Sequence, residues 1–430
     1  MISDQTIYSQ PGMWAPKGGE APLRSHLAKA TGEMLYASDM TLPDMLIGKA
    51  LRSPYPHCRI NRIEAQRALA IPGVHAVLTA QDIQGVNAVG KILTDQEILA
   101  STRARTVMDA LALVAAESGE IADAALEAID LDLTPLPAVF DPSEALKPDA
   151  LPLHAGGNLL QEFKIVYGDA EAAMTEADIV IENEYYYPWI EHAFLETESA
   201  LAAPNADGSI TIWMGCHNIY GERAQLALTF GWPEERFRVI LAPAGGSFGG
   251  KDDNILSTWC ALLAHRTNRP VRIVFKRDES MRGHSKRHSQ MINYRLGARQ
   301  DGLLMAAQVE ILSDTGAYAH WGPNIMKFAC AQSTGPYRIP AAYARARLVY
   351  TNNIVAGAMR GWGTPGIEFA IESQLDILAR RLDIHPLRLR WLNALRDGDE
   401  TISGSPLPLG SRFRETLAAA ARSQGINLKA

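Results

Sequence analysis

Residues 245–252 read Gly245-Gly246-Ser247-Phe248-Gly249-Gly250-Lys251-Asp252, and this stretch decides how the rest of the chain is interpreted. Four glycines around one aromatic residue remove Cβ atoms where a backbone must approach a ligand closely. Residues 237–241 form an apolar run of strand length, and residues 255–264 have the apolar spacing of a helix. We therefore expect the glycines on a strand-to-helix turn, where unpaired backbone N–H groups can face an anionic or oxo group. A purely structural glycine-rich turn is the alternative.

Two nucleotide-binding patterns do not fit this stretch. A dinucleotide fingerprint needs G-x-G-x-x-G followed about 20 residues later by an acidic residue, and a P-loop needs G-x-x-x-x-G-K-[ST]. Gly245 and Lys251 have the P-loop spacing, but Asp252 stands where the magnesium-binding Ser or Thr belongs. A ligand other than a nucleotide phosphate is therefore expected.

Length and charge limit the classes of protein. The 430 residues exceed the ~250–300 at which one hydrophobic core stops growing, so at least two domains are expected. The 41 basic and 48 acidic residues give a net charge of −7 without a basic block, which argues against a nucleic-acid or anionic-membrane partner. We find no secretory signal and no run of ~18 apolar residues, and we expect a cytoplasmic protein.

The four cysteines are far apart in the sequence, and no C-x-x-C pair occurs among them: Cys58, Cys216, Cys260 and Cys330. Reduced, buried thiols are the expected state in a cytoplasmic protein. The chain by itself is therefore not expected to ligate an iron–sulfur cluster or zinc.

The order of elements predicts an α+β chain with three parts. Residues 1–23 are rich in Pro and Gly and are expected to form an extended arm. Residues 24–150 form a small first domain, with strands expected at 45–52, 74–79 and 110–116 and helices at 63–70 and 121–129. Residues 151–430 form the second domain, with a strand at 210–214 and helices at 223–230, 366–382, 386–395 and 412–423.

Five motifs in the same order resemble the molybdenum hydroxylases, the xanthine dehydrogenase and aldehyde oxidase family. The glycine-rich stretch resembles the signature G-G-G-F-G-G-K-E of that family. The other four are Ser53-Pro54-Tyr55-Pro56-His57-Cys58-Arg59-Ile60 with the later Ile71-Pro72-Gly73-Val74, Glu191-His192-Ala193-Phe194-Leu195-Glu196-Thr197-Glu198, Met359-Arg360-Gly361-Trp362-Gly363-Thr364-Pro365, and Arg390-Trp391-Leu392-Asn393. The resemblance implies a small α/β hammerhead-like domain followed by the first half of a molybdopterin-binding domain.

The resemblance implies a molybdenum–molybdopterin cofactor, either as the plain pterin or as its cytosine dinucleotide. The pterin dithiolene holds the metal in that family, so no residue of this chain is expected to ligate it directly. Residues of this chain that the resemblance places at the cofactor are Gly246, Ser247, Phe248, Gly249, His217, Arg360 and Arg390. The backbone N–H groups of Phe248 and Gly249 are expected to face the oxo ligand, with glycine required because a Cβ would collide there.

Two residues are expected to face the substrate, and each candidate has a plainer alternative. Arg360 would stabilise charge developing on a heteroaromatic ring, or it is a surface Arg in a turn. Asp252 would occupy the position usually held by Glu, or it caps the following helix. Arg390 could instead pair with an acid on a helix surface, and His192 is better explained as a satisfied buried histidine beside Glu191 and Glu196.

Several departures from the family pattern affect the expected activity. The family's catalytic base lies in a Gly-Glu-x-Pro segment, and no such segment is found here. His217 replaces a Gln that hydrogen-bonds an oxygen on molybdenum, Gly366 replaces another Gln, and Ser247 replaces a Gly. Nicotinate dehydrogenases split the molybdenum subunit at this place. The C-terminal helix and tail resemble a natural end, so we expect a split subunit whose base comes from a partner chain.

The resemblance thus implies the molybdopterin-binding subunit of a multi-subunit enzyme that hydroxylates a purine-like or nicotinate-like substrate with oxygen from water. The implied partners are a second molybdopterin-binding chain, a [2Fe-2S] chain and an FAD chain, which carry two electrons away. A non-catalytic scaffold with a decayed cofactor site is the alternative. An aldehyde- or carbon monoxide-oxidising member is a third possibility, but carbon monoxide enzymes carry a Cys on the metal-facing loop and residues 245–252 contain none.

Overall fold

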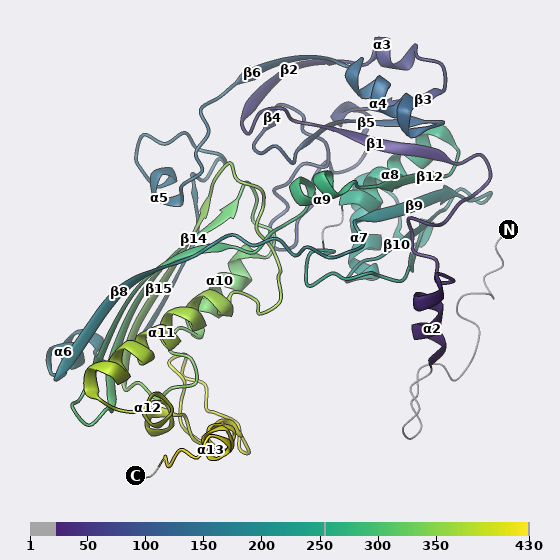
Figure 1. The fold of residues 1–430 in the computed structure, drawn as a ribbon. Coiled ribbons are helices and arrows are strands. Elements are labelled where there is room, and N and C mark those ends of the chain that lie inside the picture. The colour runs from purple at the N-terminus through teal and green to yellow at the C-terminus, as the bar shows by residue number, and fades with distance from the viewer. Residues whose placement is uncertain (1–22, 253–254, 429–430) are drawn as a thin grey trace.

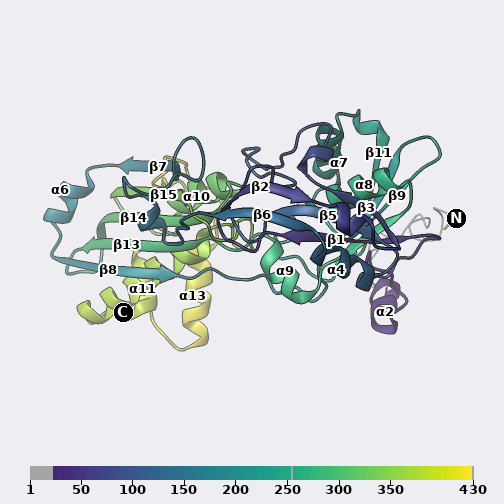
Figure 2. The same ribbon diagram turned by 90° about the horizontal axis from the view of Figure 1, so that it is seen from above.

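The computed structural model describes residues 23–252 and 255–428, which form two lobes side by side in an elongated molecule (Figures 1 and 2). One lobe is built on a seven-stranded sheet and the other on a five-stranded sheet. A three-stranded sheet contains β4 (Arg103–Ala104), β2 (Cys58–Glu64) and β6 (Asp130–Pro135). The predicted arm, residues 1–23, lies outside the described residues except for Leu23, which begins α2 (Leu23–Thr31).

The seven-stranded sheet contains an inner strand, β5, that is apolar on both faces. The strand order is β11 (Phe237–Leu241), β10 (Ile210–Met214), β9 (Ser199–Pro204), β12 (Val271–Val274), β1 (Leu46–Arg52), β5 (Ala110–Ala116) and β3 (Val74–Leu78). Every residue of β5 is buried, as expected for a strand covered on both sides. Leu113 and Ala115 pack toward Trp259, whereas Ala112 and Val114 belong to a separate core with Ala122.

Four helices and two short 3-10 turns accompany this sheet. They are α3 (Gln66–Leu69), α4 (Gly119–Glu127), α7 (Ile219–Phe230), α8 (Ile255–Thr267), η1 (Ala80–Asp82) and η2 (Glu234–Arg236). Ten successive residues of α8, from Ile255 to Ala264, are buried, so this helix is enclosed on all sides rather than amphipathic. Asn218 caps α7 by accepting from the amides of Tyr220 and Gly221.

The same sheet joins parts of the chain that are far apart in sequence. Strand β1 pairs in parallel with β12, with Leu46 opposite Val271. Strands from both sides of residue 150 therefore share one ladder and one core. The predicted boundaries at 24, 150 and 151 stay a prediction.

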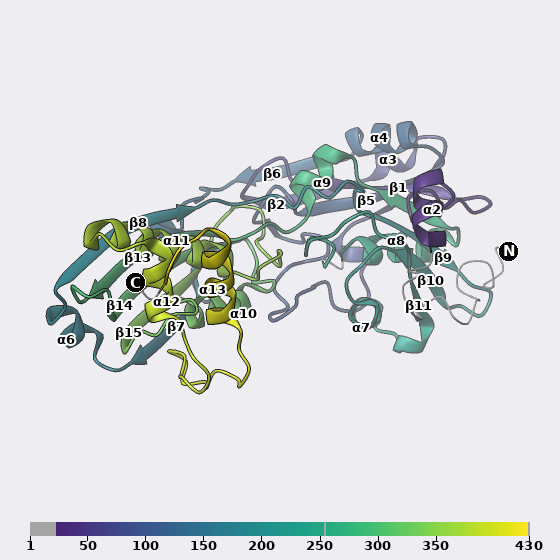
Figure 3. The same ribbon diagram turned by 60° about the horizontal axis from the view of Figure 1, so that its bottom comes forward.

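The five-stranded sheet is covered on one face by two helices. Its order is β7 (Leu159–Tyr167), β15 (Ala341–Tyr350), β14 (Leu304–Gly316), β13 (Ser289–Ala298) and β8 (Ile179–Tyr187). Helix α11 (Thr364–Leu382) packs on β13 and β8, and α10 (Gly322–Ala331) packs on β15 and β7. Both helices share one core with Ile292, Tyr294 and Leu296 of β13. Figure 3 shows α12 (Pro386–Asn393) and α13 (Phe413–Ser423) gathered beside α11. The remaining helices are α5 (Pro142–Ala145), α6 (Ala170–Thr175) and α9 (Arg277–Gly283).

Most predicted elements are confirmed, and one helix begins later than predicted. The strand at 237–241 and the helix beginning at Ile255 flank the glycine-rich loop as expected. Residues 63–70 were expected to be helical, but β2 continues to Glu64 and only Gln66–Leu69 is helical. Ile63 pairs with Leu131 of β6, so the sheet ladder overrides the local helical pattern.

In the described part of the chain, no helix combines the length and the apolar character needed to span a membrane.

Candidate molybdopterin cofactor site

The glycine-rich loop between β11 and α8 has a sharply turned backbone. Gly246, Phe248 and Gly249 have φ angles of 103°, 53° and 103°. Such values are readily adopted by glycine and are uncommon for other residues, so Phe248 is in an unfavourable conformation. Within the loop, Gly250 N–H donates to the carbonyl of Ser247 (2.8 Å) and Lys251 N–H donates to Ser247 Oγ (3.2 Å). The hydroxyl of Ser247, which replaces a family Gly, thus bonds the loop itself.

The turned backbone leaves a run of free donors. Considering only residues 23–252 and 255–428, the N–H groups of Gly246, Ser247, Phe248 and Gly249 have no hydrogen-bond partner. These four residues are half-buried or exposed, so a ligand can reach the loop, and successive N–H groups in a turn of this kind form an anion-binding concavity. The loop therefore has the form that the sequence predicts for an oxo or phosphate cradle.

Three glycines of the loop are required by the protein itself. A Cβ on Gly249 would lie 2.6 Å from the carbonyl oxygen of Ala358, and one on Gly250 would lie 2.8 Å from the ring of Phe194. A Cβ on Gly245 would lie 2.6 Å from Cβ of Glu196. The approach of a ligand was the reason expected for these glycines, and the structure adds close packing against the segments 191–198 and 355–362.

The structure brings three of the five sequence motifs together at this loop. The amide of Arg360 donates to the carbonyl of Phe248 (2.9 Å), and a ring nitrogen of His192 lies 2.8 Å from the carbonyl oxygen of Ala358. His192 is buried, which agrees with the alternative of a satisfied structural histidine. The backbone of Arg360 is also held from the other side, because its carbonyl accepts from the guanidinium of Arg287 (2.6 Å).

Arg360 presents an exposed guanidinium beside the cradle. In the described residues its side chain has no hydrogen-bond or ion-pair partner. An unpaired guanidinium is available to a ligand anion or to a ring acceptor. The exposed position in a turn also fits the plainer alternative, so the substrate-facing role stays a prediction.

Asp252 and His217 lie at the far end of the loop. The carboxylate of Asp252 is buried, accepts from the indole N–H of Trp321, and lies 3.3 Å from Nζ of Lys91 and 3.5 Å from Nδ1 of His217. The side chain of His217 is 75% exposed, and its backbone N–H donates to the carbonyl of Lys251 (3.1 Å). The carboxylate of Asp252 is therefore already engaged by Trp321, Lys91 and His217, whereas the ring of His217 is exposed.

Arg390 lies on α12, in the lobe of the five-stranded sheet, and its side chain is already occupied. Its Nε lies 2.6 Å from a carboxylate oxygen of Glu372, and its Nη1 lies 2.8 Å from Asp376. This geometry matches the alternative of an Arg paired with acids. Nothing in these contacts supports a cofactor role for Arg390, which stays a prediction.

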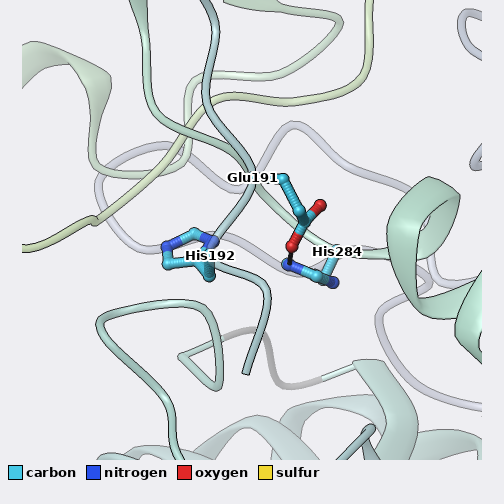
Figure 4. A group of neighbouring side chains, drawn as sticks. All are labelled: Glu191, His192 and His284. Atoms are coloured by element: carbon cyan, nitrogen blue, oxygen red, sulfur yellow. Dashed lines mark ion pairs between the residues drawn. The ribbon is translucent and has the colours of Figure 1, made fainter. Parts of the chain in front are cut away.

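A buried ionic cluster lies under the loop, with Glu191, His192 and His284 at its centre (Figure 4). The ring of His284 lies between Glu191 (3.0 Å) and Glu198 (2.6 Å), and Nζ of Lys286 lies 2.6 Å from Glu191. Burial lowers the pKa of His284, but its hydrogen bonds to Glu191 and Glu198 outweigh it and raise that pKa to about 9. Although burial opposes it, the pKa of Glu191 is lowered by its bonds to His284 and Lys286.

The ligand atoms of this cluster are close enough together for a metal site. Its charges, however, are already balanced by ion pairs within the protein. Ligand atoms of Glu191, His192 and His284 lie within 4.8 Å of one another. A protonated imidazole has no lone pair for a metal, and the buried ammonium of Lys286 already neutralises Glu191. Two carboxylates, Glu191 and Glu198, thus balance two cations, His284 and Lys286.

Gly366, another departure from the family pattern, makes room for a side chain from the neighbouring sheet. A Cβ on Gly366 would lie 2.0 Å from Oε1 of Gln290 on β13. The amide of Gln290 donates from Nε2 to the carbonyl of Gly363 (3.2 Å). Gln290 therefore occupies the space into which a side chain at position 366 would extend, and this contact cannot be read from one sequence.

Comparison with known proteins agrees with this geometry. The model of the molybdopterin cofactor-binding domain matches residues 153–394, and that of the aldehyde oxidase and xanthine dehydrogenase a/b hammerhead domain matches residues 31–137. This chain belongs to the xanthine dehydrogenase and aldehyde oxidase family. The predicted fold, a hammerhead domain followed by a molybdopterin-binding domain, is confirmed.

The chain covers individual members of this family to different extents. The chain is 43% identical to a probable xanthine dehydrogenase subunit from Bacillus subtilis, over 86% of this chain and 50% of that protein. It is 36% identical to the nicotinate dehydrogenase large molybdopterin subunit of Eubacterium barkeri, over 92% of this chain and 93% of that protein. The aldehyde oxidoreductase structure from Desulfovibrio gigas has a TM-score of 0.91 at 28% identity, over 97% of this chain and 47% of that chain. The chain thus spans about half the length of the first and third of these relatives.

One pair of residues at the family's loop was not predicted from the sequence. Lys251 lies within the glycine-rich motif and Glu196 within the segment 191–198, but neither was expected to have a role of its own. In the structure their side chains form a buried ion pair of 2.6 Å. A cationic residue in the glycine-rich motif and an acidic residue in the segment 191–198 were the available signal, because burying either charge alone is unfavourable.

Proposed function

We propose that this chain is the molybdopterin-binding subunit of a multi-subunit molybdenum hydroxylase acting on an N-heteroaromatic substrate of the purine or nicotinate type, with water as the oxygen source. The observation that carries the proposal is the run of four free backbone donors at residues 246–249, bordered by the unpaired guanidinium of Arg360. The proposal is further supported by the family membership and by the named relatives, which are xanthine and nicotinate dehydrogenases.

The residues present suit a molybdenum–molybdopterin cofactor. Gly246, Ser247, Phe248 and Gly249 would hold an oxo or phosphate oxygen through their amides, and His217 would donate from its exposed ring. When bound, the cofactor supplies the two-electron redox centre for hydroxylation. The donors suit either the plain pterin or its cytosine dinucleotide form, since both present anionic oxygens.

Arg360 and Asp252 are proposed to act on the substrate. The guanidinium of Arg360 would bind the substrate ring and stabilise negative charge that develops on it. Asp252 is buried and would act through His217, whose exposed ring lies 3.5 Å from its carboxylate. Lys91 and Trp321 would keep that carboxylate in place.

The remaining parts of the reaction are assigned to partner chains. The base, a second molybdopterin-binding chain, a [2Fe-2S] chain and an FAD chain would complete a cytoplasmic enzyme. The name of the Eubacterium barkeri relative, a large molybdopterin subunit covered over 93% of its length, supports a split arrangement.

The test is metal analysis of the chain purified with the proteins encoded beside it and, separately, alone. Near-stoichiometric molybdenum and pterin in the complex, followed by oxidation of purines or pyridine carboxylates, would support the proposal. An intact complex without molybdenum would overturn it and leave the scaffold alternative, for which the occupied side chain of Arg390 is the structural argument.

A further inference from the structure

One carboxylate oxygen binds both ends of the glycine-rich loop. Oε2 of Glu196 accepts from the backbone N–H of Gly245 (2.5 Å) and from Nζ of Lys251 (2.6 Å). The backbone N–H of Glu196 also donates to the carbonyl of Gly245 (3.2 Å). The residues between these two ends include all four free donors of the cradle.

Both side chains of this pair are shielded from water. The side chain of Glu196 is 12% exposed and that of Lys251 is 4% exposed, and Nζ of Lys251 lies 5.0 Å from the centre of the Phe194 ring. An ammonium in such a place depends on its counter-ion, because removing one partner leaves an uncompensated buried charge. Removing either partner is therefore expected to cost more than removing one partner of an exposed surface ion pair.

The loop conformation needs to be held from outside. Gly246, Phe248 and Gly249 all have positive φ, and for Phe248 this conformation is strained. Among the described residues the amides of residues 246–249 have no partner, and the two hydrogen bonds inside the loop, both to Ser247, are made by the amides of Gly250 and Lys251. Such a conformation persists only where the surrounding structure over-determines it.

We infer that Glu196 and Lys251 are positioning residues that fix the loop in its cofactor-binding conformation before any cofactor is bound. Fixing the ends of the loop in advance reduces the ordering that binding would otherwise require. The inference rests on the proposed function where it concerns the cofactor, but the preorganisation itself is a property of the chain alone.

The first experiment measures amide hydrogen exchange in the full chain without cofactor, resolved to the amides of Gly245, Gly250 and Lys251. In Glu196→Gln and in Lys251→Met these amides are expected to exchange roughly tenfold faster than in the wild type, since a charge-assisted contact is lost. The matched control is Glu279→Gln, which breaks a different partly buried ion pair, with Arg52 (3.4 Å), and leaves exchange in the loop unchanged. Wild-type exchange in both pair variants would overturn the inference.

A double variant, Glu196→Gln with Lys251→Met, separates positioning from stability. Removing both charges together restores much of the thermal stability that either single change loses. The loop amides are nevertheless expected to exchange fast, because the link between the two ends of the loop is still absent. Recovery of slow exchange together with stability would show that the pair has only a structural role.

The second experiment measures molybdenum and pterin per chain in the purified complex. The pair variants are expected to hold roughly fivefold less cofactor than the wild type, whereas Glu279→Gln holds as much as the wild type. A wild-type complex without molybdenum would refute the proposed function but leave the exchange result standing. Full cofactor content in variants with fast exchange would overturn the link between the loop's preorganisation and binding.

Discussion

Gly249 illustrates how a single residue of the loop is constrained twice. Its φ of 103° disfavours any side chain, and a Cβ would lie 2.6 Å from a backbone carbonyl oxygen, which cannot move as a flexible side chain can. The same residue contributes one of the four free amides. Conformation, packing and ligand binding therefore require glycine at this position for separate reasons.

Gly249→Ala is expected to displace the loop and to abolish cofactor binding while lowering the free energy of unfolding by about 2–4 kcal/mol. Molybdenum per chain and urea denaturation measure the two effects. Gly410→Ala is the matched control, because Gly410 has a φ of 83° but open space around it. Equal losses of stability in both variants would show that the clash with Ala358 is unimportant.

Arg360→Ala is expected to lower kcat/KM roughly 10²–10³-fold, as for the loss of a group that stabilises developing charge. The melting temperature and molybdenum content should stay at wild-type values, because the contacts of Arg360 that the structure shows are made by its backbone. Steady-state kinetics with a purine and a pyridine carboxylate provide the measurement. Unchanged kinetics would favour the surface-turn alternative.

His284 predicts a pH dependence of stability. Its pKa is raised to about 9 by Glu191 and Glu198, against burial and the positive charge of Lys286. The stabilisation is therefore fully present below the ordinary pKa of about 6.5 and is lost as pH rises through 9. Urea denaturation between pH 7 and 9.5 should show this decline in the wild type but not in His284→Gln. His75→Gln, which changes an exposed histidine paired with Glu117, should keep the wild-type slope.

At the scale of elements, the contact between α11 and β13 decides how the helix after the motif at residues 359–365 is packed. The buried residues of α11, which include Gly366, Ile367, Ala370 and Ile371, recur with helical spacing and form one stripe. Gly366 lies at the first turn of this helix, against Gln290 of β13. The helix can approach the sheet closely there because Gly366 has no side chain.

Gly366→Ala is expected to lower the free energy of unfolding by about 1–3 kcal/mol, because the new methyl group overlaps the amide of Gln290. Combining it with Gln290→Ala should recover part of that loss, and a double-mutant cycle by urea denaturation gives the coupling energy. Strictly additive effects would contradict the contact. Gly119→Ala, also in the first turn of a helix, controls for the backbone change, because a built Cβ there comes no closer than 3.7 Å to its nearest neighbour, Nζ of Lys49.

At the scale of the whole molecule, the two lobes are joined by buried polar contacts. The hydroxyl of Tyr318 donates to the carboxylate of Asp109, with both oxygens within 2.9 Å. Burial raises the pKa of Asp109 to about 6, while hydrogen bonds from Arg105 and Tyr318 oppose the shift.

Tyr318→Phe is expected to lower the free energy of unfolding of the full chain by about 1–3 kcal/mol, because a buried carboxylate loses a donor. Thermal unfolding followed by calorimetry measures this loss. Tyr186→Phe, at an exposed tyrosine, should be neutral. A neutral Tyr318→Phe would mean that Asp109 is satisfied by its backbone donors from Arg105 and Thr106.

The sequence alone determined the elements around the glycine-rich loop, the family and its fold. Glycine spacing and apolar periodicity are local properties of the sequence, and short motifs in a fixed order can be identified in a single sequence. The helix expected at 63–70 is confined to Gln66–Leu69, because pairing between β2 and β6 outweighs the local helical preference of Ile63 and Glu64.

Only the tertiary structure decided which charged side chains meet. It placed Arg390 between Glu372 and Asp376, filled the space at Gly366 with Gln290, and joined Glu196 to Lys251. The partners in the last pair are 55 residues apart in the chain. Such contacts follow from how sheets and helices pack, because a buried charge needs a partner and the packing determines which oppositely charged residue lies close enough.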